Sequence, residues 1–277
     1  MEIRKGVLYV TGTPIGNLGD LSPRALETLG GVDFIAAEDT RVSLKLLTKF
    51  GIKKPMLACR RHNIREVSGE IVRRLQGGES CAVITDAGMP CISDPGAELV
   101  GLCRERGVET EVVPGPSALV AALALSGFAC RRFSFEGFLS VNPRQRKERL
   151  DKIKDYDGLI VLYEAPHKLN KTLADLLSAL GDREIAVCRE MTKIHEEVLR
   201  GCLSEVSVHF ENTAPRGEFV IVIEPLTGGS PPVNPADAAK IAQDLVTQGH
   251  KPAEACKLAA KQTKLSKSEI YKEYLKI

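Results

Sequence analysis

Short apolar runs alternate with amphipathic stretches along the first half of the chain. The runs are the length of a strand, and the stretches between them repeat apolar residues every three or four positions, as a helix does. This alternation predicts a mostly parallel sheet with helices on both faces. The expected strands are 7–11, 34–37, 56–59, 81–84 and a segment ending at Val113, and the expected helices contain 23–29, 44–50, 64–75 and 97–106.

The pattern changes after Gly127, where the chain becomes richer in aromatic residues and in candidate strands. This half predicts a second lobe with a mixed sheet and more antiparallel pairing. A helix is expected over 167–180. The expected strands are 158–164, 185–188 and 218–224, with weaker strand patterns at 196–200 and 203–208.

The last part of the chain has a helical pattern throughout. Its composition predicts a linker at 227–232. Three short helices are expected over 236–277, with breaks near 249–252 and 265–266. Three helices with turns of this size resemble a helix-turn-helix module. This segment has eight Lys against five Asp and Glu. It is either a helical cap with a solvated basic face or a surface that binds RNA. The expected α/β domains are thus 1–118 and 119–226, followed by a helical tail at 233–277.

Composition excludes several classes of protein. The 277 residues are 43% hydrophobic and 27% charged with a net charge of +2, so a nucleic acid would have to bind through local basic patches. The eight Cys are scattered without C-x-x-C spacing, so we expect no metal site and, with reduced thiols, a cytoplasmic location. No apolar run approaches the ~18 residues that span a membrane.

Loops rich in Gly, Pro and Asp follow the predicted strands of the first sheet. The most informative of them is 85–96, and similar loops occupy 12–17 and 114–118. The carboxyl ends of parallel strands are where open α/β sheets bind ligands. None of these loops is a dinucleotide or P-loop motif, and Pro14 lacks the N–H that a phosphate cradle would use. The sequence therefore predicts a ligand without phosphate.

Several polar residues at strand ends have two interpretations. Asp39 and Ser117 are either simple helix N-caps or members of a site. The Arg clusters at 60–65, 131–132 and 144–149 are either solvated surface or contacts to a phosphate backbone. Charged strand ends at 163–164 and 189–193 indicate a cleft between two lobes.

These motifs together resemble the tetrapyrrole-methylase superfamily. The resemblance covers about residues 7–225, and the tail resembles a helical extension found in one subgroup. That subgroup uses S-adenosylmethionine to methylate the ribose 2′-hydroxyl of a cytidine in the decoding region of 16S rRNA. The resemblance implies a two-lobe fold and a homodimer. The motifs that carry it are 8–18, 36–41, 86–90, 92–96, 114–118, 135–139, 163–167, 189–193 and 216–218.

The resemblance also implies roles for individual residues. S-adenosylmethionine is expected between the lobes, and Glu38, Asp39 and Glu190 are candidates for a general base. Arg41, Asn63 and Arg189 are expected to orient the RNA. Asp86 and Asp94 are expected to shape their loop rather than to take part in chemistry. The residues expected around the cofactor are Pro14, Asp86, Ala87, Gly88, Met89, Ile92, Ser117, Ala118 and Tyr163.

Two other functions are compatible with the same sequence. One is a tetrapyrrole C-methyltransferase of the same fold, because a polyanionic tetrapyrrole would also suit the Arg clusters. The other is a non-catalytic factor that binds RNA or the ribosome and has kept the fold. Transfer of a labelled methyl group to rRNA, to a porphyrinogen or to neither distinguishes the three.

Overall fold

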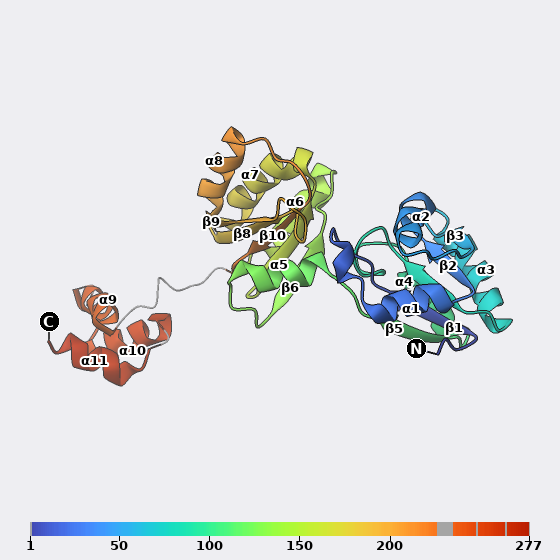
Figure 1. Ribbon diagram of the computed structural model, residues 1–277. Helices are drawn as coiled ribbons and strands as arrows, with labels where there is room; N and C mark the ends of the chain where they lie inside the picture. The colour runs from blue at the N-terminus through green and yellow to red at the C-terminus, as the bar shows by residue number, and fades with distance from the viewer. Residues whose placement is uncertain (1, 226–234, 248, 264, 277) are drawn as a thin grey trace. The chain divides into compact units, whose positions relative to one another are not determined.

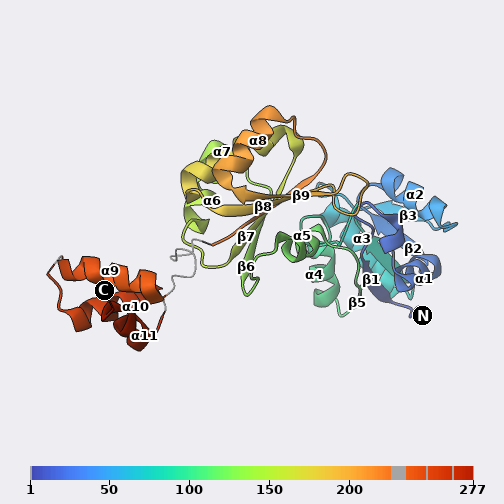
Figure 2. The ribbon, with the colours of Figure 1, turned by 60° about the vertical axis from the view of Figure 1, so that its left-hand side comes forward.

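The computed structural model describes residues 2–225, 235–247, 249–263 and 265–276, and these form two compact units, 1–224 and 225–277. The predicted linker at 227–232 lies outside the described residues. The division of the first unit at residue 118 stays a prediction. Figures 1 and 2 show two sheets in this unit, each covered by helices.

The first sheet is parallel, as predicted, with strand order β3-β2-β4-β1-β5. Its central strand, β4, pairs with β1, with Cys81 opposite Leu8, so the loops that follow these two strands leave the same edge. The strands are β1 (Val7–Thr11), β2 (Phe34–Ala37), β3 (Met56–Ala58), β4 (Cys81–Ile84) and β5 (Glu109–Val113).

Alternating side chains of this sheet build two cores, because successive residues of a strand face opposite sides. Tyr9 and Ile35 pack with α1 (Pro23–Gly31) and α2 (Thr40–Lys49) on one face. Leu8 and Phe34 pack with helices α3 (Ile64–Gln76) and α4 (Ala97–Glu105) on the other. Helix α1 begins as expected, with Ser22 as N-cap and Pro23 in its first turn. Here a hydroxyl and a proline fix where the helix starts.

The second sheet is mixed, with order β6-β7-β10-β8-β9 and only β6 and β7 parallel. Helix α5 (Ala118–Ser126) covers one face, and α6 (Pro143–Ile153), α7 (Leu169–Leu180) and α8 (Leu203–Asn212) cover the other. The strands are β6 (Phe133–Gly137), β7 (Leu159–Glu164), β8 (Glu184–Arg189), β9 (Glu197–Cys202) and β10 (Phe219–Ile223). Short 3-10 helices at Leu18–Asp20 and Pro166–Lys168 complete this unit.

The strand predicted at 203–208 is wrong, because these residues begin α8. The alternation of Val206 and Val208 suggested a strand, but Val208 is exposed while Leu203, Val206 and Phe210 are buried at helical spacing. A capping box between Cys202 and Glu205 fixes the start of this helix. Local capping therefore outweighs the short alternating pattern.

The described residues of the second unit form three short helices, as predicted: α9 (Pro235–Thr247), α10 (Pro252–Thr263) and α11 (Lys267–Tyr274). They enclose a small core of mostly alanine side chains with Cys256 and Ile270. Among the described residues, no helix is both long and apolar enough to cross a membrane.

Candidate active site

Three loops at the carboxyl edge of the first sheet are held together through their backbones. Thr13 and Gly88 exchange two backbone hydrogen bonds, N–H to O at 2.9 and 3.1 Å. The loops after β1 and β5 touch at Gly12 and Gly115, where a Cβ on Gly12 would lie 2.7 Å from the Gly115 Cα. Only glycine permits this approach, so these glycines fix the shape of the site.

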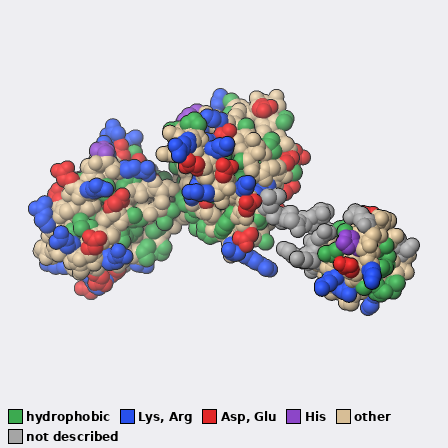
Figure 3. Space-filling view, turned by 180° about the vertical axis from the view of Figure 1, so that it is seen from behind, with side chains coloured by type: hydrophobic (Ala, Val, Ile, Leu, Met, Phe, Trp, Pro, Cys, Tyr) green, Lys and Arg blue, Asp and Glu red, His purple; other side chains and the backbone are tan. Residues whose placement is uncertain are grey.

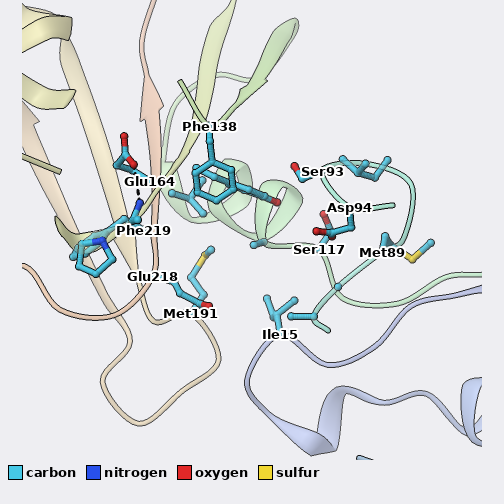
Figure 4. Close-up of a pocket in the computed structure, with 18 residues that line it drawn as sticks. Ile15, Met89, Ser93, Asp94, Ser117, Phe138, Glu164, Met191, Glu218 and Phe219 are labelled. Carbon is cyan, nitrogen blue, oxygen red and sulfur yellow. Dashed lines mark hydrogen bonds between the residues drawn. The ribbon is translucent and has the colours of Figure 1, made fainter. Parts of the chain in front are cut away.

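A cavity of about 340 Å³ lies where these loops meet the second sheet. Its volume suits a small organic ligand. Figure 4 shows Ile15, Met89 and Asp94 on the side of the first sheet, and Phe138 and Met191 on the side of the second. The lining is mainly apolar, with Asp94, Glu164 and Glu218 as its acidic residues. The Glu164 carboxylate accepts hydrogen bonds from Thr172 and the Ala165 N–H, and that of Glu218 pairs with Lys193.

Tyr163 joins β7 to the start of α5 at the edge of the cavity. Its hydroxyl accepts a hydrogen bond from the Leu119 N–H at 3.0 Å, in the first turn of α5. Phe135 and Phe138 contact its ring edge-to-face, with centroids 4.8 and 5.7 Å away. Burial raises the pKa of the phenol, so Tyr163 is a neutral, rigid wall of the site.

Most residues expected around the cofactor line this cavity, although their roles stay predictions. Pro14 does not line it, and its neighbour Ile15 does. The Asp86 carboxylate accepts a hydrogen bond from the Asp39 N–H at 3.2 Å instead of lining the cavity. The expected residues that do line it are Ala87, Gly88, Met89, Ile92, Ser117, Ala118 and Tyr163.

The polar groups of the cavity suit a cationic ligand. Ser117 occupies the N-cap position of α5, yet its side chain makes no capping hydrogen bond, so the simple capping interpretation does not account for it. Burial, and then the charges of Glu38 and Asp86, raise the pKa of Asp94. The charge of Arg61 and a hydrogen bond from Thr85 offset this rise only in part, and a carboxylate with a raised pKa gains from a further positive charge nearby.

Glu38 and Asp39 lie together at the end of β2, beside the cavity rather than in its lining. Glu38 accepts a hydrogen bond of 2.6 Å from the Thr85 hydroxyl. Asp39 is the N-cap of α2, and hydrogen bonds from Arg41 hold its pKa far below the usual range. The capping role expected for Asp39 is therefore confirmed, and its low pKa makes it a weak base.

Glu190 lies on the opposite side, in a strained loop next to Met191. Its φ is +50°, in the left-handed region, and Thr192 has φ +66°. Its carboxylate accepts hydrogen bonds from the Lys193 ammonium and the Glu218 N–H, both at 3.0 Å. Burial opposes its ionisation, but these hydrogen bonds outweigh burial and lower the pKa of Glu190.

The three residues expected to contact RNA are held differently. Arg41 is largely exposed and pairs with Asp39. The Asn63 side chain makes two hydrogen bonds with backbone groups: it accepts one from the Arg60 N–H and donates one to the Ala58 carbonyl. Arg189 donates to the Arg216 carbonyl at 2.7 Å. Of the three, Arg41 has the most exposed guanidinium and Asn63 has a clear structural role.

Other residues reach the site without having been assigned to it from sequence. Arg61 donates to the Ser93 carbonyl at 3.1 Å and so brings the turn after β3 to the cavity loop. Phe138, Met191 and Glu218 line the cavity from the second sheet. Each lies at or beyond a strand end inside a motif of the resemblance, which is the signal that could have identified them.

The fold and the cavity together define a two-lobed α/β methylase. The chain belongs to the tetrapyrrole (corrin/porphyrin) methylases, whose family model matches residues 7–207. S-adenosylmethionine is accordingly its methyl donor.

Individual proteins agree with this assignment. The chain is 43% identical to the ribosomal RNA small subunit methyltransferase I of Synechocystis sp. over 98% of both chains. The protein of that name from Thermotoga maritima is 48% identical, and the match covers 79% of this chain and 98% of that protein. A solved cobalt precorrin-4 methyltransferase shares the fold, with a TM-score of 0.61 and 20% identity over 79% of this chain and 95% of that chain.

Proposed function

We propose that this protein transfers a methyl group from S-adenosylmethionine to the ribose 2′-hydroxyl of a cytidine in the decoding region of 16S rRNA. The observation that carries the proposal is the near full-length similarity, at 43% identity, to a protein named for small-subunit rRNA methylation. The assignment of a cytidine and its ribose 2′-hydroxyl as the target rests on the motif resemblance. A homodimer is a further expectation from the same source, and light scattering tests it. A cytoplasmic location is expected from the reduced cysteines.

The cavity residues fit the cofactor in charge and polarity. S-adenosylmethionine supplies an electrophilic methyl group and carries a sulfonium and an ammonium but no phosphate. Asp94 offers a carboxylate to these cations, whereas the Glu218 carboxylate already pairs with Lys193 at 2.9 Å. Met89 and Met191 offer apolar surface. Because the Gly88 N–H and carbonyl are both occupied by Thr13, the backbone groups of Ala87 and Met89 are left to read the polar ends of the cofactor. These residues contribute chiefly by holding the reacting atoms in line.

Glu38 is the best general base of the three candidates. Asp39 and Glu190 both have a lowered pKa because cationic side chains donate hydrogen bonds to them. Glu38 instead accepts a neutral hydroxyl, that of Thr85, and lies near Asp86 and Asp94. In the described structure, Glu38 thus lacks the cationic hydrogen-bond donors that hold Asp39 and Glu190.

The RNA is expected to approach across the turn that follows β3. Arg61 is exposed there, and Arg41 extends from the start of α2. Arginine matches phosphate geometry, and neutralising phosphates makes affinity depend on salt. This arrangement would bring phosphates next to the cavity.

The test is transfer of a radiolabelled methyl group to small ribosomal subunits that lack the modification, followed by nucleoside analysis. Label on a cytidine ribose supports the proposal. Label in a porphyrinogen, or RNA binding without transfer, would replace it with one of the two other functions.

Single-turnover rates of Glu38→Gln, Asp39→Asn and Glu190→Gln test which carboxylate is the general base, with the exposed Glu105→Gln as control. We expect Glu38→Gln to be slowed most, by about 100-fold; near-normal rates in all three variants would remove the base assignment.

A further inference from the structure

Helix α11 of the tail carries apolar and basic side chains together on its outer face. Tyr271 is 39% exposed and Leu275, just beyond the helix, is 67% exposed. Lys267 lies four residues before Tyr271, which places it on the same side of the helix, and Lys272 is exposed beside them. Ile270 is fully buried in the tail core. We call Lys267, Tyr271, Lys272 and Leu275 the α11 face.

The charge of this face is uncompensated. Glu269 accepts the Ser266 N–H in a capping box, and Glu273 pairs with Lys276. Within the described part of the tail, neither Lys267 nor Lys272 has a carboxylate in ion-pair range. The α11 face therefore presents two unpaired cations around an aromatic ring. Figure 3 shows basic and hydrophobic side chains close together on the visible side of this unit.

We propose that the α11 face binds an unpaired segment of the substrate RNA, with one base stacked on Tyr271 and phosphates at Lys267 and Lys272. The Tyr271 ring already packs against Tyr274, with centroids 6.3 Å apart and planes 25° apart, so it is a supported platform. Stacked aromatic rings flanked by lysines are the general means of holding single strands. The proposal rests on rRNA being the substrate.

An unpaired segment suits this face better than a duplex groove. A helix-turn-helix module reads B-form DNA by placing a helix in the major groove. The major groove of A-form RNA is too deep and narrow for that, whereas unpaired bases are free to stack on aromatic side chains. A tail that resembles a helix-turn-helix module can therefore bind RNA if α11 contacts unpaired bases through its exposed face and does not enter a duplex groove.

The location of the cavity indicates that such binding is separate from the chemistry, and the length of one relative is compatible with this. The Thermotoga maritima protein is matched over 98% of its length by 79% of this chain. The tail unit, 225–277, is about a fifth of the chain. The cavity lies wholly in the other unit, so the α11 face should affect RNA affinity and leave the cofactor site unchanged.

The test uses the full chain with Tyr271→Ala, Tyr271→Phe and Lys272→Ala, and Lys240→Ala on α9 as the matched control, because Lys240 is already paired with Asp237. The probe is an unmethylated 16S rRNA transcript. For Tyr271→Ala we expect the Kd for RNA to rise about tenfold, as for loss of one stacked base. Tyr271→Phe should bind like the unmodified chain, and Lys272→Ala should reduce the salt dependence of binding. The Kd for S-adenosylmethionine and the single-turnover rate at saturating RNA should stay unchanged in every variant.

Unchanged RNA affinity in Tyr271→Ala and Lys272→Ala would overturn the proposal. A drop in oligomeric mass in these variants, with unchanged RNA affinity, would show that the α11 face contacts protein instead. Tyr271→Ala could weaken RNA binding while the unmodified chain transfers no methyl group. That result would support RNA binding by the α11 face and contradict the proposed methylation reaction. Circular dichroism at 222 nm confirms that the helices of each variant are intact.

Discussion

Single residues decide the electrostatics of the cavity, and Asp94 is the clearest case. It was expected only to shape its loop, but it lines the cavity and burial raises its pKa. Protonation of Asp94 removes the attraction for the cationic cofactor. Cofactor affinity should therefore fall as the pH decreases from 7 through this raised pKa, which lies above the usual value near 4.

Calorimetry across this pH range checks the prediction. Asp94→Asn should weaken S-adenosylmethionine binding at pH 7 about tenfold and flatten its pH dependence. Asp86→Asn is the matched comparison, because Asp86 also has a raised pKa but points to the Asp39 N–H. An equal effect of the two substitutions would mean that loop charge in general, not Asp94, attracts the cofactor.

Gly12 tests whether loop contact shapes the site. Its Cβ in Gly12→Ala would lie 2.7 Å from the Gly115 Cα and from the Met89 Sδ. Because Gly115 contributes backbone atoms that cannot turn aside, the loops must separate. We expect a loss of about 1–3 kcal/mol in the free energy of unfolding and at least about a tenfold loss of cofactor affinity. Urea unfolding and calorimetry measure both, and Gly30→Ala, with no atom within 4 Å of its Cβ, is the control.

Sequence patterns located the site at this scale but could not rank its residues. The loops were predictable because Gly, Pro and Asp at strand ends have few other uses. The pairing of Asp39 with Arg41 fits their spacing in sequence, whereas the contact of Glu190 with Glu218 joins residues 28 apart. Burial and a mixture of local and long-range hydrogen bonds shift the pKa values of Asp39 and Glu190, so the choice among the three candidate bases needed the structure.

Among the elements, buried strands were predicted best. β2 and β4 have the expected bounds because four consecutive apolar residues, buried on both faces, have no other stable arrangement in an α/β fold. The segment 203–208 was mistaken because six residues fit both periods, and the capping box at its start was overlooked. Helix α6 was not predicted either, since its surface is mostly charged and Arg146 is buried against Asp175 and Thr172.

Helices α3 and α4 each contain a glycine in their interior that packing does not require. A Cβ added to Gly69 in α3 or to Gly101 in α4 would have no atom within 4 Å. Gly69→Ala and Gly101→Ala should each raise the free energy of unfolding by about 0.5–1 kcal/mol, because alanine loses less backbone entropy in a helix. Urea midpoints measure this effect. A decrease in either variant would show that these helices need the flexibility of glycine.

At the scale of the whole molecule, the chain combines a catalytic unit with a tail that the cavity does not use. β10 lies in the middle of the second sheet, between β7 and β8, and it ends at Ile223. A chain that ends at Pro225 therefore keeps every strand of both sheets and every residue that lines the cavity. It should unfold cooperatively and bind S-adenosylmethionine within about twofold of the full chain, while its affinity for RNA decreases.

The matched control for this truncation ends at Gly217 and removes β10 as well. Without β10, strands β7 and β8 lose their shared partner, and Phe219 and Ile221 leave the core. Loss of large buried side chains typically costs about 2–5 kcal/mol each, so this shorter chain should not fold. Thermal unfolding and calorimetry separate the two cases. If the chain that ends at Pro225 also fails to fold or to bind cofactor, the tail is part of the catalytic unit, and its separate role in RNA binding would have to be abandoned.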